Sequence, residues 1–353
     1  MNDLVSIVVP IYKAENFVAN LINDVIAQTY QCWELILVSN GDHRAKQKEI
    51  CQKYTLADKR IRLLISNRKG TSIARNMGVE NAKGKWLTFL DADDRISPTH
   101  LQFYIDAVAD DVDMIIGGFT EYSLNGKEKL YPMESHNSAL EGSAFFDYYL
   151  SSHTYLQGMV WNKFYKTDIL AKSDIRFHED IVHIEDLVYN YELLIHCSNV
   201  KTITMTGYKY IRRNDSTTGR FTPNFENSLR LLGDLHSKIC KMAGYSEYKI
   251  SQIMTKKQYV NTYNCVINLF RPDCPISFGE KVKHLELLLN DKDFKRSRAL
   301  PNRTEHKMNL RIFDFFVMLG SPLCMSVGYT IIFKIRELYL NLKKKYYLSA
   351  LFD

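Results

Sequence analysis

The sequence lacks the features that identify several common protein classes. Its seven cysteines form no Cys-X-X-Cys pair and no metal-ligand spacing, so we expect buried, reduced thiols. The net charge is only +6 over 353 residues, which argues against a nucleic-acid-binding protein. No repeat and no low-complexity stretch is present. No basic segment precedes the first apolar run, so we expect no signal peptide and a cytoplasmic protein.

Short apolar runs alternate with segments of helical spacing over the first 90 residues. The predicted strands are 5–10, 33–38, 61–65 and 86–90, and the predicted helices are 16–29, 45–54 and 72–82. This alternation predicts an α/β fold whose parallel sheet is wound by right-handed crossovers. Ligands of such sheets bind at the carboxyl ends of the strands, so segments 10–12, 39–40 and 91–93 should meet around one cleft.

The pattern is looser beyond Pro98. Further strands are predicted at 113–119, 159–165 and 200–211, and helices at 140–150, 187–197 and through 224–289. Pro272 and Gly279 mark a break inside the last of these regions.

The run Phe89-Leu90-Asp91-Ala92-Asp93-Asp94 ends a buried strand in three carboxylates. Such groups repel one another and are costly to desolvate. A hard divalent cation held by oxygen ligands, and through it a phosphate, explains the cluster. The structural alternative is that Asp94 or Ser97 caps the helix that follows Pro98.

Several other segments accompany this run in a fixed order. They are Val8-Val9-Pro10-Ile11-Tyr12, Gln28-Thr29-Tyr30, Glu34-Leu35-Ile36, residues 70–78 (GTSIARNMG), Trp161-Asn162-Lys163, Glu185-Asp186, Tyr210 and residues 212–216. Together they resemble the family 2 glycosyltransferases of the GT-A fold, over about residues 4–220. The resemblance implies a nucleotide-sugar-binding half at 1–105 and an acceptor-binding half with the catalytic base at 106–220.

The resemblance also implies the residues that bind the donor. Asp93 would hold Mn²⁺ or Mg²⁺ against the diphosphate, and Asp91 would be a second ligand, turned toward the ribose or a bound water. Pro10 and Tyr12 would border the base. Arg75 would lie near the base and the phosphates, with a surface ion pair as the alternative.

Arg213 and Arg220 lie in a polar stretch that would close over the diphosphate. The alternative is that they are solvated cations of a loop. Two differences from the family concern the donor site: Ser39 and Asn40 replace the usual pair of aspartates, the first of which contacts uracil, and Ile184 replaces a common glycine. Ser39 and Asn40 still offer hydrogen-bonding groups to a base, but neither is a charged acceptor.

Transfer by direct displacement requires one carboxylate base and no covalent nucleophile. The resemblance assigns this role to Asp186, with Glu185 beside the acceptor. Their alternative role is to stabilise a helix N-terminus, and Glu179-Asp180 is a second candidate base. Trp161 would offer a face for a sugar ring of the acceptor, with a place in the core as its alternative.

The C-terminal region divides into a helical extension at 221–300 and a basic tail at 301–353. Residues 312–333 are largely apolar, but Gly320-Ser321-Pro322 interrupts them and basic residues flank both sides. We expect two amphipathic helices lying in the membrane interface. Packing on the core, dimerisation and a membrane-spanning helix are the alternatives.

The sequence therefore predicts a cytoplasmic enzyme, peripheral on the inner face of the cell membrane. By resemblance it would transfer a sugar, with inversion, from a nucleotide diphosphate sugar (UDP is favoured) to a lipid-linked or growing glycan of a capsule, O-antigen or outer core. The alternatives are a nucleotidyltransferase that makes sugar nucleotides and a non-catalytic nucleotide- or glycan-binding subunit. The first would need a glycine-rich phosphate loop, which residues 10–16 lack.

Overall fold

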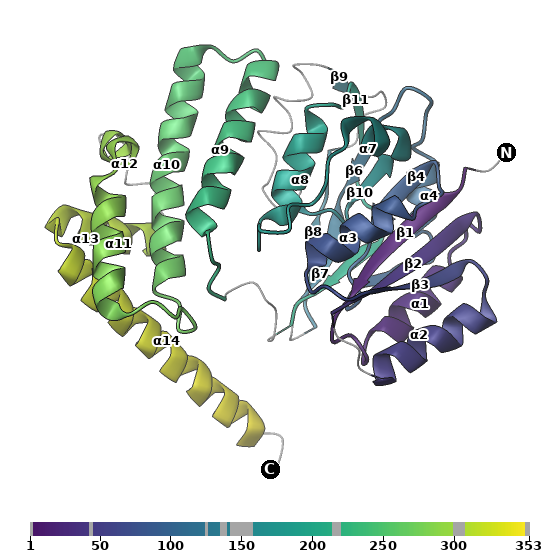
Figure 1. Cartoon of the computed structure of the whole chain (residues 1–353), viewed down its shortest axis with the longest axis horizontal. Coiled ribbons are helices and arrows are strands. Elements are labelled where there is room, and N and C mark those ends of the chain that lie inside the picture. The colour runs from purple at the N-terminus through teal and green to yellow at the C-terminus, as the bar shows by residue number, and fades with distance from the viewer. Residues whose placement is uncertain are drawn as a thin grey trace. The chain divides into compact units, whose positions relative to one another are not determined.

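The computed structural model describes residues 3–41, 45–123, 126–134, 140–141, 158–213, 220–298 and 308–349. The chain forms two compact units (Figure 1). Unit 1 comprises residues 1–216 and 234–245, and unit 2 comprises residues 217–233 and 246–353. The predicted boundary at residue 301 thus falls inside unit 2.

The main sheet of unit 1 is mostly parallel. Its strand order, within the described residues, is β3 (Ile61–Ser66), β2 (Trp33–Asn40), β1 (Val5–Ile11), β4 (Trp86–Phe89), β10 (Lys163–Lys166), β6 (Met114–Gly117), β11 (Asn199–Ile203) and β9 (Leu140–Glu141). Strands β1 to β4 run parallel, as do β6 and β11, whereas β10 is antiparallel to both of its neighbours. The predicted α/β class is confirmed. Because β1 pairs with both β2 and β4, the carboxyl ends of the three strands lie together.

Among the described residues, the helices of unit 1 include α1 (Val18–Ile26), α2 (Ala45–Ala57), α3 (Thr71–Glu80), α4 (His100–Ile105), α7 (Thr167–Ser173) and α8 (Glu185–Leu194). Helix α3 packs on β1 and β2. The approach to β1 is so close that a Cβ on Gly78 would lie 2.2 Å from Cγ1 of Val8. A larger residue at position 78 would push α3 away from the sheet, and with it the residues that α3 carries toward the strand ends.

Two predicted strands each continue from the main sheet into a second sheet. This sheet has the order β5 (Arg95–Ile96), β12 (Tyr208–Ile211), β7 (Phe119–Tyr122) and β8 (Glu128–Tyr131). The segments predicted as single strands at 113–119 and 200–211 are therefore divided into β6 and β7, and into β11 and β12. At the first division a Cβ on Gly118 would lie 2.1 Å from the carbonyl oxygen of Thr204, so the two breaks lie against each other. The predicted helix at 140–150 begins instead as β9, and its remainder lies outside the described residues.

Unit 2 is helical. It contains α10 (Glu247–Leu269), α11 (Phe278–Asn290), α12 (Lys292–Ser297), α13 (Met308–Leu319) and α14 (Pro322–Ser349), and α9 (Phe225–Met242) is divided between the two units. Its core is formed by Tyr259, Val266, Leu269, Phe270, Cys274, Leu285, Phe294, Phe313, Val317, Met325 and Tyr329.

The last four of these core residues belong to the predicted tail. The first part of that segment therefore packs within unit 2, as one of the alternatives proposed. Among the described residues, no helix has the length and apolarity needed to cross a bilayer.

Candidate active site

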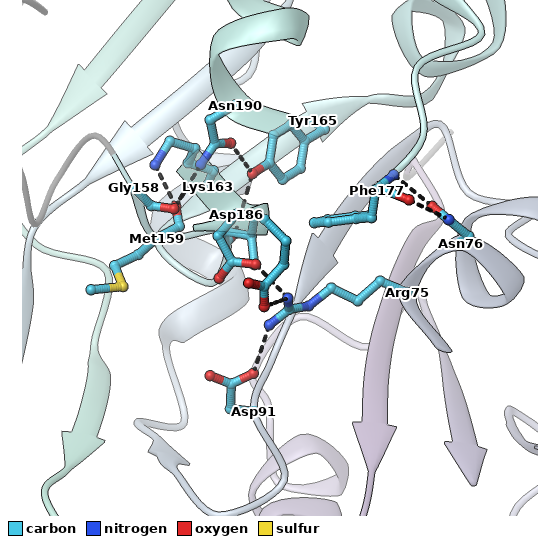
Figure 2. Close-up of polar contacts among 12 residues, drawn as sticks. Arg75, Asn76, Asp91, Gly158, Met159, Lys163, Tyr165, Phe177, Asp186 and Asn190 are labelled. Carbon is cyan, nitrogen blue, oxygen red and sulfur yellow. Dashed lines mark hydrogen bonds and ion pairs between the residues drawn. The ribbon is translucent and has the colours of Figure 1, made fainter. Parts of the chain in front are cut away.

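Arg75 is the centre of the charged site in unit 1 (Figure 2). It lies on α3 and is only 3% exposed. Its Nη2 is 3.3 Å from Oδ1 of Asp91, at the end of β4, and its Nη1 is 3.5 Å from Oε1 of Glu185. Nη1 also donates a close hydrogen bond to Oδ1 of Asp186, at the start of α8. One buried guanidinium thus joins the acidic run after β4 to the second acidic motif, 95 residues further along the chain.

The surroundings of this cluster alter the ionisation of its members. Burial raises the pKa of the Asp186 carboxyl to about 8, although the nearby Arg75 opposes the shift. Burial likewise raises the pKa of Asp91. Burial alone would lower the pKa of Arg75, but the three carboxylates raise it overall, so the guanidinium stays charged. Asp186 consequently holds a proton near neutral pH more readily than an ordinary aspartate.

The start of α8 shows why Glu185 and Asp186 are not simply helix caps. Ile184 occupies the N-cap position, and no side chain there accepts a capping hydrogen bond. Both acidic side chains lie in the first turn of α8, where the helix dipole favours negative charge. They are directed to Arg75, which makes them part of the charged site.

Lys163 is a buried lysine near Asp186, and its motif alone predicts no role for it. Its Nζ donates to Oδ1 of Asn162 at 3.0 Å and to the carbonyl oxygen of Met159. Burial lowers the pKa of Lys163 to about 7, and the charge of Asp186 opposes this shift. The Trp-Asn-Lys motif contains this lysine, but the strand that it begins, Lys163–Lys166, also ends in a lysine, so the sequence gives no sign that Lys163 is buried.

The residue after Arg75 anchors a neighbouring segment of backbone. Asn76 Nδ2 donates to the carbonyl oxygen of Phe177 at 2.9 Å, and the Phe177 N–H donates to Asn76 Oδ1 at 2.8 Å (Figure 2). The Phe177 ring in turn lies 5.3 Å from the guanidinium of Arg75. Adjacent residues of the Ala-Arg-Asn-Met-Gly motif therefore have different tasks: one binds carboxylates, and the other holds the loop that covers the arginine.

The other two carboxylates of the acidic run have different partners. Asp93 Oδ2 accepts from Nε of Arg213 at 3.0 Å. Asp94 is buried, and it accepts from the Tyr208 hydroxyl at 2.6 Å and from the Ile211 N–H at 2.8 Å. Burial raises the pKa of Asp94 well above its usual range. Asp94 thus fastens the acidic run to β12.

The alternative that Asp94 or Ser97 caps the next helix is wrong. Helix α4 begins at His100, its N-cap residue is Thr99, and no side chain provides a capping bond.

Asp91 and Asp93 are suited to a divalent ion that the substrate helps to bind. In the part of the chain that the structure describes, no group of three or more acidic, histidine or cysteine side chains forms a metal site. Each aspartate, however, has one carboxylate oxygen on an arginine and a second oxygen that can face a ligand. Mg²⁺ commonly binds one or two carboxylates together with substrate phosphates and waters. The two residues therefore fit a metal shared with a diphosphate, rather than a preformed cage.

The predicted base-binding residues lie at the carboxyl ends of β1 and β2. Pro10 is the penultimate residue of β1, and Tyr12 directly follows the strand and is 38% exposed. The ammonium groups of Lys13 and Lys69 lie 5.3 Å and 5.0 Å from the centre of its ring. A hydrogen bond with Lys69 lowers the pKa of the Tyr12 phenol. This end of the sheet therefore offers an aromatic face with two cations beside it.

Ser39 and Asn40, which replace the usual aspartates, are both buried. Asn40 Oδ1 accepts from the Gly70 N–H at 2.7 Å, immediately before α3 begins. In the pairing of β1 with β2, Ser39 lies opposite Ile11, the residue that precedes Tyr12. Asn40 therefore orients the start of α3, and Ser39 lies where the resemblance places the base.

Trp161 does not offer the open face that was predicted for an acceptor sugar. It is 2% exposed, and its ring is stacked at 4.2 Å from Tyr208 and at 5.7 Å from Tyr210. The prediction is corrected to the alternative weighed with it: these contacts place the indole in the core, where it supports β12.

The structure does not join two other candidates to the Arg75 cluster. Glu179, the second candidate base, pairs with Arg68, and both side chains are well exposed. Arg220 belongs to unit 2, whereas Arg213 of unit 1 contacts the acidic run.

Comparison with known proteins agrees with this arrangement. Residues 6–167 match the family model described as "Glycosyl transferase family 2". The uncharacterized glycosyltransferase EpsJ of Bacillus subtilis is 28% identical over 268 residues, which are 75% of this chain and 76% of that protein. The glycosyltransferase GlyG of Streptococcus pneumoniae is 35% identical over 124 residues, which are 35% of this chain and 41% of GlyG.

Solved structures show a similar fold. S. aureus TarS (residues 1–349), crystallised with UDP-GlcNAc, aligns with a TM-score of 0.62 at 18% identity, covering 84% of this chain and 83% of that chain. The same protein with UDP aligns with a TM-score of 0.61 at 17% identity, covering 94% and 91%. These likenesses, together with the sheet topology, identify the GT-A fold.

Proposed function

The chain is a glycosyltransferase of family 2, and from that premise we propose that it transfers a sugar from a UDP-sugar to a hydroxyl of a lipid-linked or growing glycan in bacterial surface polysaccharide synthesis. The observation that carries the proposal is the Arg75 cluster, which brings the donor-side Asp91 and the candidate base Asp186 to one guanidinium. The TarS complexes with UDP and UDP-GlcNAc support uridine as the base. The relatives EpsJ and GlyG support glycosyl transfer.

The proposed mechanism is a single displacement with inversion. Asp186 takes the proton of the acceptor hydroxyl as the oxygen attacks the anomeric carbon, and the bond to the UDP leaving group breaks with its electrons going to the diphosphate. Glu185 shares Arg75 with Asp186 and would contact the acceptor. The raised pKa of Asp186 makes it a stronger base than an ordinary aspartate once it is ionised.

The departing diphosphate needs positive charge. Mn²⁺ or Mg²⁺ held by Asp93 and Asp91 would neutralise the negative charge that develops on the leaving group. Arg213 pairs with Asp93 and lies 3.6 Å above the ring of Phe17, which orients the guanidinium toward the acidic run. We propose that Arg213 contacts the diphosphate directly, as an additional fixed cation.

The family decides between the two enzyme classes that the sequence left open. A nucleotidyltransferase has no support from the family model or from EpsJ and GlyG, which are named as glycosyltransferases. A non-catalytic binding subunit remains the second candidate, because Ser39 and Asn40 remove the charged acceptor expected for uracil.

The test is a thermal-shift panel of UDP, GDP, dTDP and CMP with the full chain, each with and without Mn²⁺, followed by turnover of UDP-sugars. Metal-dependent stabilisation by UDP alone supports the proposed donor. Stabilisation by another nucleotide would replace uridine in the proposal. Binding of UDP without release of UDP from any donor, in the presence of glycan acceptors, would favour the binding subunit.

A further inference from the structure

Exposed apolar side chains concentrate on α13 and α14 of unit 2. Among the described residues, 18 large apolar side chains are well exposed, and eight of them lie between positions 315 and 338. Large contiguous apolar surface is uncommon on soluble proteins and typically marks an interaction site. This concentration is not explained by the donor and acceptor chemistry of unit 1.

Helix α14 has two apolar faces. Met325 and Tyr329 point into the core of unit 2. On the other side, an exposed face is formed by Val327, Ile331, Ile335 and Leu338, which are between 44% and 63% exposed. These four are spaced by four, four and three residues, so they form one continuous stripe along the helix. Only the face with Met325 and Tyr329 contributes to the core of unit 2.

Helix α13 repeats this arrangement. Phe313 and Val317 are buried in the core, whereas Phe315, Met318 and Leu319 are between 52% and 75% exposed. We call these exposed residues of the two helices the apolar stripe. Its members are Phe315, Met318, Leu319, Leu323, Val327, Ile331, Ile335 and Leu338.

The charge of α14 indicates what covers the stripe. The helix carries five basic residues (Lys334, Arg336, Lys343, Lys344, Lys345) and one acidic residue, Glu337. Tyr346 and Tyr347 follow the lysines in the sequence, and tyrosine is favoured where a bilayer meets water. Beyond Phe333, none of the described side chains of the helix belongs to the core of unit 2 (Figure 1 shows the helix continuing in yellow).

We propose that the apolar stripe docks on the surface of an anionic lipid bilayer, with α13 and α14 lying in the interface and not crossing it. The apolar side chains enter the acyl boundary, and the lysines and arginine pair with anionic headgroups. A second copy of the chain fits less well, because it would add five more basic residues to the same interface. The proposal does not depend on the donor chemistry of unit 1.

The experiment is co-sedimentation of the full chain with vesicles of phosphatidylcholine plus phosphatidylglycerol, and with vesicles of phosphatidylcholine alone. The triple variant Ile331→Gln, Ile335→Gln and Leu338→Gln removes most of the stripe on α14 without touching the core. We expect binding to the mixed vesicles, and a loss of roughly tenfold or more in the partition coefficient of the variant. Replacing Lys343, Lys344 and Lys345 with Gln should remove the preference for anionic lipid.

The matched control is the triple variant Leu56→Gln, Leu130→Gln and Leu287→Gln, which changes three side chains that are 63% to 88% exposed elsewhere. It should bind vesicles like the unmodified chain, and circular dichroism should show that both triple variants are folded. Equal losses in the two variants, or no binding of the unmodified chain, would overturn the proposal. A dimer in light scattering that the stripe variant converts to a monomer, with vesicle binding unchanged, would show that a second copy covers the stripe.

Discussion

The active site of unit 1 and the apolar stripe of unit 2 both reverse the usual distribution of side chains. In unit 1, Arg75 is buried and its three carboxylates are partly buried, whereas on α13 and α14 of unit 2 large apolar groups are exposed. Proteins ordinarily bury apolar groups and leave charges in water. Each reversal opposes folding, and the two differ in how the chain compensates for it.

In unit 1 the compensation is internal, because the Arg75 guanidinium forms ion pairs with three carboxylates. In unit 2, the stripe is exposed among the described residues, and we propose that a lipid surface supplies its compensation. Internal compensation makes the charged site sensitive to single substitutions. Substitutions in the stripe should therefore leave the stability of the free protein unchanged. They should weaken only the binding of the partner.

The largest effect should follow from removing the candidate base. Asp186→Asn keeps the size of the side chain but cannot accept the acceptor proton, so we expect kcat to fall by about 10²–10⁴-fold. UDP binding, measured by calorimetry, should be retained. Glu179→Gln is the control, since Glu179 pairs with Arg68 away from the cluster, and it should leave kcat nearly unchanged. The reverse pattern would transfer the base role to Glu179.

Removing the buried cation should destabilise unit 1 strongly. Arg75→Met leaves Asp91, Glu185 and Asp186 without their counter-charge, so urea denaturation should show a loss of about 3–5 kcal/mol. Arg68→Met removes an exposed partner instead and should cost less than about 1 kcal/mol. Similar losses in the two variants would show that the buried cluster is not held by Arg75.

The Arg75→Met deficit should also depend on pH. In the folded variant, burial without the counter-charge keeps the carboxyl pKa values above those of the unfolded chain, so the folded state holds protons that the unfolded state releases. Stability therefore falls as the pH rises from about 4 toward about 8. The deficit measured near pH 5 should be smaller than that near pH 8, and a deficit independent of pH would contradict this account.

The rate of transfer should rise with pH in the unmodified enzyme. Asp186 acts only when ionised, and its pKa is raised to about 8 by burial, so kcat/KM should increase about tenfold for each pH unit below that value and then level off. Initial rates with a fixed UDP-sugar across the pH range measure this. A profile that is flat between about pH 6 and 9 would mean that the free enzyme already holds Asp186 ionised.

The smallest effect concerns the nucleotide base. Ser39→Asp restores the charged acceptor that the family places opposite uracil, and a hydrogen bond to a charged group is stronger than one to a neutral group by about 1 kcal/mol. We expect UDP to bind a few-fold more tightly in calorimetry, and GDP to be unaffected. Weaker UDP binding in this variant would show that Ser39 contacts the base through a different geometry.

The sequence predicted the regular part of the fold well. Alternation of β1 to β4 with α1 to α3 was visible because parallel strands buried on both faces form continuous apolar runs. The division of two later strands was not visible, since it depends on the mutual contact of two breaks near Gly118 and Thr204 that lie far apart in the chain.

The candidate site was also predicted only in part, because its contacts join residues that lie far apart in the chain. The order of the motifs identified Arg75, Asp91 and Asp186 as candidates. Only the structure shows that both aspartates contact Arg75, because Arg75 and Asp186 are 111 residues apart in the chain. Lys163 was missed because a lysine in a motif gives no sign of its burial. Trp161 was misassigned because a tryptophan in the sequence does not show which neighbours cover its ring.

The two faces of α14 place the stripe and the core of unit 2 on one piece of chain. A deletion of the whole stripe would also remove Met325 and Tyr329 from the core, whereas a truncation after Phe333 would remove only Ile335, Leu338 and the basic residues. The part of the stripe that precedes Phe333 can therefore change only by substitution if the core is to be kept. A relative could thus lose its attachment site and still keep every helix of unit 2, so the presence of α14 in a relative says nothing about attachment unless its outward residues are compared.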